Sequence, residues 1–92
     1  MNNKRRKTLS KISARLSSLQ AEIVSLQEEL EGVVQEEQDC LDNTPESLKE
    51  SEKYREAEEA LENLAELSTD LEENAYDLES IANHLQETAT GG

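Results

Sequence analysis

Aliphatic residues recur through the first third of the chain at alternating spacings of three and four positions. This spacing gathers them on one stripe of an α-helix, whereas a half-buried strand would alternate at every second residue. The pattern holds over four heptads, with an aliphatic residue at both apolar positions of each. It predicts a helix over residues 8–38 whose packing seam is Leu9, Ile12, Leu16, Leu19, Ile23, Leu26, Leu30 and Val33.

A second periodic segment follows, and its stripe combines large and small residues. Counted in heptads from Tyr54, one apolar position is mostly small and the other is mostly leucine. Small residues let a neighbouring helix approach closely, which suits an antiparallel pair or a bundle better than a parallel two-stranded zipper. The pattern predicts a helix over residues 48–87 whose large seam residues are Tyr54, Leu61, Leu64, Leu71, Leu78 and Leu85.

Residues 39–47 separate the two segments and contain the single proline, Pro45. Proline keeps the preceding Thr44 out of the helical region and suits the first position of a new helix. A capping-box pattern that begins at Ser47 offers another start, so the second helix is expected to begin between Pro45 and Ser51. The single domain expected comprises a flexible basic start at 1–7, helices at 8–38 and 48–87, a turn at 39–47 and a flexible tail at 88–92.

The two helices have similar lengths and a short connection, as an antiparallel helical hairpin requires. Charge gives an independent indication. Six basic residues lie between Lys4 and Arg15, and an antiparallel arrangement sets them beside acids near the end of the second helix, such as Asp77 and Glu87. The expected fold class is therefore all-α, an antiparallel coiled-coil hairpin of two long helices.

A lone pair of helices buries little apolar surface, so isolated units of this size are marginal in stability. Val24, Val34, Leu67 and Ile81 flank the two seams. They either broaden the contact within the hairpin or face a second copy. We expect the second arrangement, a homodimer that forms a four-helix bundle. Tyr76 lies outside the seam and, with Val24, Leu67 and Ile81, is a candidate partner contact.

Composition limits the partners. Hydrophobic residues make up 34% of the chain and aromatic residues 2%, which excludes a thick globular core. The formal net charge of −13 would repel nucleic acid and anionic membranes and would attract a protein with a basic surface. No apolar segment is long enough to span a membrane, and a lone cysteine suits a reducing compartment. We expect a cytoplasmic location.

The chain lacks the patterns of a catalytic, cofactor or metal site, and we expect no enzymatic activity. Its many carboxylates form neighbouring pairs, but adjacent helical residues point in different directions and no apolar pocket would tune their pKa values. His84 has no second ligand nearby and is expected on the surface, while Cys40 is expected to be a half-buried filler. Gly32, inside the first helix, costs about 1 kcal/mol relative to alanine.

One stretch and the basic start carry a resemblance. The stretch runs from Asp42 to Tyr54 and continues into Ala57–Leu61, and the start reads N-K-R-R-K from Asn3 to Lys7. The specific part of the stretch is D-N-x-P-E-S-L, from Asp42 to Leu48. Together they resemble small acidic helical proteins encoded by bacteriophages and mobile elements of Gram-positive and gut bacteria. The resemblance covers nearly the whole chain, but outside this stretch it is general coiled-coil pattern. It assigns no role to any residue.

Two functions are therefore predicted from different classes. The first is a non-enzymatic interaction or structural module, in which an acidic hairpin associates with itself and binds a protein partner. The second is an anti-defence inhibitor from a phage or mobile element, in which the acidic surface mimics DNA and occupies a nucleic-acid-binding protein. Nucleic-acid binding through the basic start ranks third, because the cluster has neither aromatic residues nor a second basic face beside it.

Overall fold

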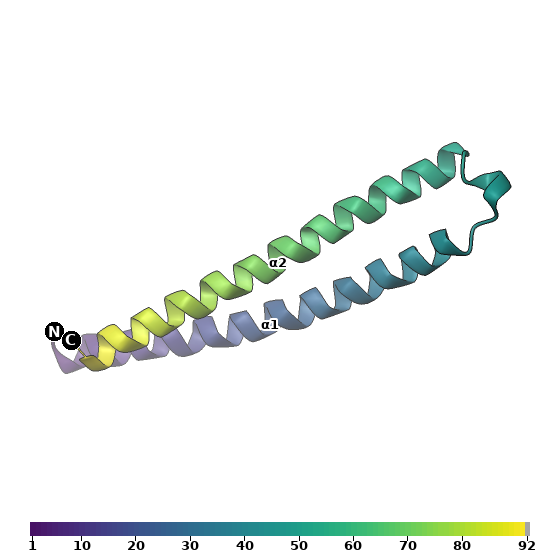
Figure 1. Ribbon diagram of the computed structural model, residues 1–92. Coiled ribbons are helices and arrows are strands. Elements are labelled where there is room, and N and C mark those ends of the chain that lie inside the picture. The colour runs from purple at the N-terminus through teal and green to yellow at the C-terminus, as the bar shows by residue number, and fades with distance from the viewer. Residues whose placement is uncertain (92) are drawn as a thin grey trace.

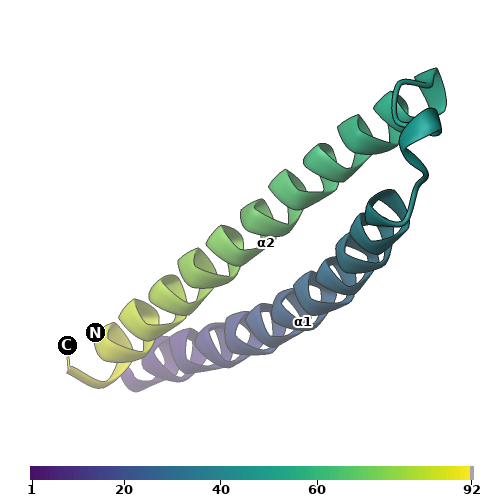
Figure 2. The same cartoon turned by 45° about the vertical axis from the view of Figure 1, so that its right-hand side comes forward.

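Two long helices lie antiparallel, side by side. A computed structural model describes residues 1–91 and contains α1 (Asn3–Asp42), the 3₁₀ turn η1 (Glu46–Leu48) and α2 (Glu52–Gly91). Figures 1 and 2 both show the two termini at one end of the molecule and the turn at the other. The Cα atoms extend over 70 × 14 × 14 Å. The predicted all-α antiparallel hairpin is confirmed.

Helix α1 begins five residues earlier than residue 8, so most of the basic start is helical rather than flexible. The side-chain oxygen of Asn2 caps the helix by accepting a 2.9 Å hydrogen bond from the backbone N–H of Arg5. Positive charge opposes the dipole of its own helix there, but it lies beside the C-terminus of α2. The Arg6 guanidinium donates a 3.1 Å hydrogen bond to the carbonyl of Ala89, a group that α2 leaves without a helical partner.

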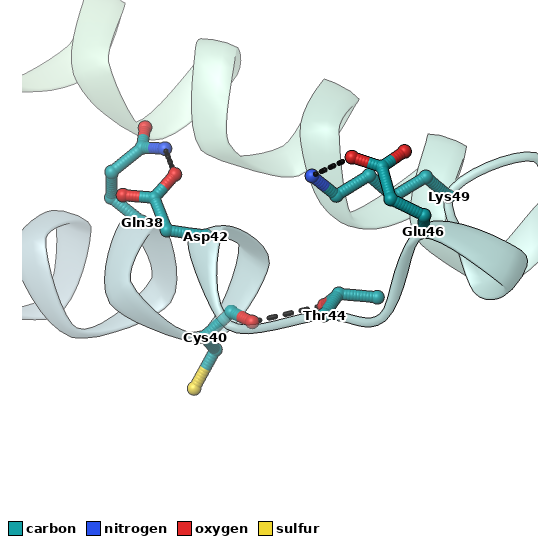
Figure 3. Close-up of polar contacts among 6 residues, drawn as sticks. All are labelled: Gln38, Cys40, Asp42, Thr44, Glu46 and Lys49. Atoms are coloured by element: carbon teal, nitrogen blue, oxygen red, sulfur yellow. Dashed lines mark hydrogen bonds and ion pairs between the residues drawn. The ribbon is translucent and has the colours of Figure 1, made fainter.

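Local hydrogen bonds extend α1 to Asp42, four residues beyond the predicted end at 38. Figure 3 shows the Gln38 amide donating to the Asp42 carboxylate at 2.9 Å within the last turn. The hydroxyl of Thr44 then donates to the carbonyl of Cys40 at 3.0 Å. The Thr44 bond satisfies a carbonyl that the end of the helix would otherwise expose, and the bond from Gln38 to Asp42 joins two side chains one turn apart. Both support the helix past the failure of the aliphatic pattern.

After Pro45 the chain makes a single 3₁₀ turn instead of starting the second helix. The Lys49 ammonium donates to the Glu46 carboxylate at 3.3 Å in this turn (Figure 3). That hydrogen bond, together with the attraction between the two charges, raises the pKa of Lys49 above its ordinary value. Because Glu46 is 91% exposed and Lys49 is partly exposed, the pair contributes little to stability.

Helix α2 begins at Glu52, four residues later than the predicted start at 48 and one beyond the expected range. Ser51 fixes this start, because its hydroxyl oxygen accepts a 3.2 Å hydrogen bond from the backbone N–H of Tyr54. The helix continues to Gly91, so residues 88–91 are helical rather than a flexible tail.

Three side chains of α1 donate hydrogen bonds to α2 and define the register of the hairpin. In each pair the two residue numbers add to 95, as 13 and 82 do. Any residue of α1 therefore lies level with the residue of α2 whose number, added to its own, gives 95. The donors are one and two heptads apart and therefore belong to one row of α1. The bonds run from Arg6 to the Ala89 carbonyl, from Ser13 to the Ala82 carbonyl and from Gln27 to the Ser68 hydroxyl, at 3.1, 2.7 and 3.4 Å.

The most buried residues of the interface are small. On α2 they recur once per heptad, and on α1 Ser13 is buried among them. Side chains of this size let the two helix backbones approach closely. Within residues 1–91 Leu41, near the turn, is the one large apolar side chain that is buried, so the hairpin has a thin core. The small residues of α2 are Ser68, Ala75, Ala82 and Ala89, and they are exposed by only 6, 5, 3 and 5%.

Replacing Ala82 with leucine tests this close approach. Ala82 is 3% exposed and its carbonyl accepts the Ser13 hydroxyl, so the larger side chain would force the helices apart. Such overpacking should lower the free energy of unfolding by about 1–3 kcal/mol. The matched control is Ala14→Leu, at an exposed position of α1. Urea unfolding followed by circular dichroism measures both. Equal midpoints for the two variants would contradict a tight interface at Ala82.

Gly32 gives a second stability prediction. A Cβ atom built on Gly32 meets nothing within 4 Å, so alanine fits without contact. Gly32→Ala should raise the free energy of unfolding by about 0.5–1 kcal/mol, because glycine loses more backbone entropy on folding. Gly91→Ala, equally open but at the end of α2, should change thermal unfolding far less. Destabilisation by Gly32→Ala would show that its surroundings are occupied.

Candidate functional site

The aliphatic stripe of α1 is divided between two surfaces. Leu9, Leu16, Ile23 and Leu30 are half-buried against α2. The alternate members of the stripe face away from α2, contrary to the single seam that the spacing predicts. They are Ile12, Leu19, Leu26 and Val33, which are 39, 49, 54 and 50% exposed.

The residue that follows each of those four in the sequence packs against α2 instead. Ser13 and Gln27 bond to α2, and Gln20 and Val34 belong to the same row and are half-buried. The Ser13 hydroxyl is buried, and burial of a hydroxyl without a partner would cost free energy. The Ala82 carbonyl supplies that partner. Helix α1 is therefore rotated so that a polar and small edge of its stripe faces the small residues of α2.

Helix α2 adds to the exposed row. Leu67 and Ile81 are 53 and 49% exposed and each precedes a buried small residue of the interface. In an antiparallel pair, the positions just before the shared seam of each helix lie on the same side. The exposed residues of both helices therefore form one apolar face, which comprises Ile12, Leu19, Leu26, Val33, Leu67 and Ile81.

The opposite side of the hairpin is an acidic groove of about 460 Å³. Val24 and Tyr76 contribute its apolar lining, and Tyr76 is 67% exposed. The sequence grouped these two residues with Leu67 and Ile81 as partner contacts, but they lie on different sides of the molecule. The carboxylates of the acidic groove belong to Glu28, Glu31, Glu72 and Glu79.

Charge divides the hairpin along its length. The terminal half, residues 1–22 and 73–92, has six basic residues and five acids, a net charge of +1. The turn half, residues 23–72, has three basic residues and 17 acids, a net charge of −14. Among residues 1–91 the one ion pair within 4.0 Å is that of Lys49 with Glu46, so the basic start contacts α2 through the Arg6 hydrogen bond instead.

The residues considered for chemistry lie apart. Cys40 is exposed rather than half-buried, because it follows Val33 by one heptad on the outward row of α1. His84 is exposed on α2. Residues 1–91 contain no group of three or more His, Cys, Asp or Glu side chains that could hold a metal ion. Over the same residues, neither helix combines the length and apolar character needed to cross a bilayer.

The spacing of the aliphatic residues does not reveal the polar contacts that orient α1. Ser13 and Gln27 interrupt no aliphatic pattern, since they stand beside the stripe rather than within it. A signal was nevertheless present. Ser13, Gln20, Gln27, Val34 and Leu41 are one heptad apart, and this row becomes more apolar toward the turn, where Leu41 is buried.

No protein family, curated protein or solved structure gives a significant match to this chain. A hairpin fold by itself is compatible with many activities, so the surfaces of the chain are the guide to its function.

Proposed function

We propose that the chain is a non-enzymatic helix-packing module of the cytoplasm. It associates with itself through the apolar face and offers its acidic surfaces to a protein partner. The observation that carries this proposal is the alignment of six aliphatic side chains, four of α1 and two of α2, on one side of the hairpin. Single exposed aliphatic residues are common on soluble proteins, whereas six that share one side of a hairpin favour an interaction surface there.

The thin core supports the same proposal. The buried apolar residues among 1–91 are Leu41 and three alanines, which is little for 40-residue helices. Isolated helices gain most of their stability from burying an apolar stripe against other elements. Half of the stripe of α1 is left 39–54% exposed by the hairpin. A further helical surface over the apolar face would complete its burial.

Polar substitution of the apolar face tests the proposal. The wild-type chain should have twice its 10.3 kDa mass in light scattering at micromolar concentration. The double variant Leu19→Gln and Leu26→Gln removes the two middle members of the face on α1, which are 49 and 54% exposed, and should shift the mass to that of one chain. Circular dichroism should still report helix, since neither side chain faces α2.

The control is the double variant Ser18→Gln and Ser25→Gln, which places the same residue type at neighbouring exposed positions of α1. It should retain the wild-type mass. A wild-type chain that stays at 10.3 kDa throughout this concentration range would contradict self-association.

A second candidate, an acidic inhibitor that mimics DNA, rests on the charge density of the turn half. This half is about 35 Å long, half of the 70 Å extent, so its 17 carboxylates come about every 2 Å, against one phosphate per about 1.7 Å of duplex DNA. A protein that binds DNA through basic side chains would meet a comparable density of negative charge.

Capture from a bacterial lysate on immobilised protein tests the second candidate. A DNA mimic should retain DNA-binding proteins and release them when duplex DNA is added. Glu56→Gln, Glu59→Gln and Glu66→Gln together should reduce retention severalfold, because they remove exposed charge from the turn half. The control removes three exposed charges from the terminal half, through Glu73→Gln, Asp77→Asn and Glu87→Gln. Retention that is insensitive to duplex DNA would exclude mimicry.

A further inference from the structure

The apolar face is nearly symmetric about the middle of the hairpin. On α1 its members occupy positions 12, 19, 26 and 33, which are centred between 22 and 23. On α2 they occupy 67 and 81, which are centred on Asn74, and Asn74 lies level with residue 21 of α1. The two centres therefore differ by less than two residues, or about 2–3 Å along the helix.

We infer that a second copy of the chain covers the apolar face in the opposite direction, with its turn over the termini of the first. This inference rests on the proposed self-association and adds the orientation. A two-fold axis through the common centre sets α1 against α1 of the second copy and α2 against α2. It brings Ile12 to Val33, Leu19 to Leu26 and Leu67 to Ile81 of the second copy. Such an interface is isologous, as most homodimer interfaces are.

Asn74 distinguishes this orientation from the alternative with both turns at one end. In the opposite direction, Asn74 meets Asn74 of the second copy at the axis, where each amide can donate to and accept from the other. With the turns together, α1 lies over α2 of the second copy. Because Asn74 is level with residue 21 of α1, it then lies beneath Leu19, two residues away along the helix. An amide buried against leucine lacks a hydrogen-bond partner and disfavours that arrangement.

Charge favours the same orientation. The opposite direction places the turn half, with a net charge of −14, over the terminal half of the second copy, with a net charge of +1. With the turns together, two halves of charge −14 would lie against each other. Repulsion between like charges at this density opposes association strongly at ordinary ionic strength.

The area of the face suits a dimer. Its row on α1 runs from Ile12 to Val33, a rise of 21 residue steps or about 32 Å, and two packed helices are roughly 20 Å across. A strip of these dimensions covers roughly 600 Å² on each copy and about 1,200 Å² in total, at the lower end of stable interfaces. The second copy therefore meets the size requirement without any other segment of the chain.

Cys40 permits a direct test in the wild-type sequence. It is the single cysteine of the chain, it is exposed, and it lies beyond the last aliphatic member of the apolar face. A nitroxide attached there leaves the face itself intact. In the inferred dimer Cys40 lies level with Arg5 of the second copy, so the two labels are 35 residues apart along the bundle, or about 52 Å. Turns at one end would bring them within roughly 25 Å.

Pulsed double electron–electron resonance on the labelled protein at micromolar concentration should give one distance near 50 Å, and dilution with unlabelled chain should remove the signal. A distance below about 25 Å would overturn the orientation while leaving self-association intact. Absence of dipolar modulation would overturn both.

A second label separates these outcomes from a local effect at the turn. The variant Cys40→Ser with Ser25→Cys carries the label near the centre of α1, on an exposed position outside the apolar face. Its two labels should lie within roughly 30 Å of each other in either orientation. A long distance at Cys40 together with a short distance at Ser25→Cys is the expected pair of results. Short distances at both positions would overturn the opposite direction.

Discussion

The close approach of α1 to the small residues of α2 determines the remaining features of this hairpin. Ser13 lies within that contact, and its buried hydroxyl donates to the Ala82 carbonyl at 2.7 Å. The bond requires the small and polar edge of α1 to face α2, because a leucine at this place would hold the helices apart. The rotation of α1 about its own axis is thereby fixed, and with it the direction in which every other side chain of α1 points.

Because of that rotation, α2 covers only one side of the aliphatic stripe of α1. Leu16 and its equivalents contact α2, while Leu19 and its equivalents remain about half exposed together with Leu67 and Ile81. The charges follow a separate division, since the basic start lies beside the negative end of α2 and the acids gather toward the turn. A second copy that packs in the opposite direction would cover the apolar side and would place its less charged half over the acidic half of the first copy.

The pattern of the sequence was sufficient for the fold but not for the rotation of α1. The spacing of Leu9 through Val33 predicts a helix, and Pro45 predicts the turn. Neither says which edge of a broad stripe meets α2, because that choice depends on a bond between residues 69 positions apart. The exposed position of Cys40 follows from the same rotation and was missed for the same reason.

The ends of the helices were also misplaced, for local reasons. Asn2 caps α1 before the aliphatic pattern starts, and Ser51 caps α2 although Ser47 has the more recognisable capping-box spacing. Cap choice depends on where the chain enters each helix, and in α2 the 3₁₀ turn after Pro45 decides it. Of the predicted partner contacts, the sequence could identify Tyr76 as exposed but could not place it across the hairpin from Leu67.

If the outward half of the α1 stripe is a packing surface, its methyl groups become covered when chains associate. Methyl NMR with a soluble gadolinium chelate tests it directly, by comparing the relaxation enhancement of Leu19 and Leu26 with that of Leu16 over a range of protein concentration. Leu16 should be protected throughout, and Leu19 and Leu26 should become protected as the concentration rises. Leu19 and Leu26 methyl groups that stay equally accessible at every concentration would contradict it.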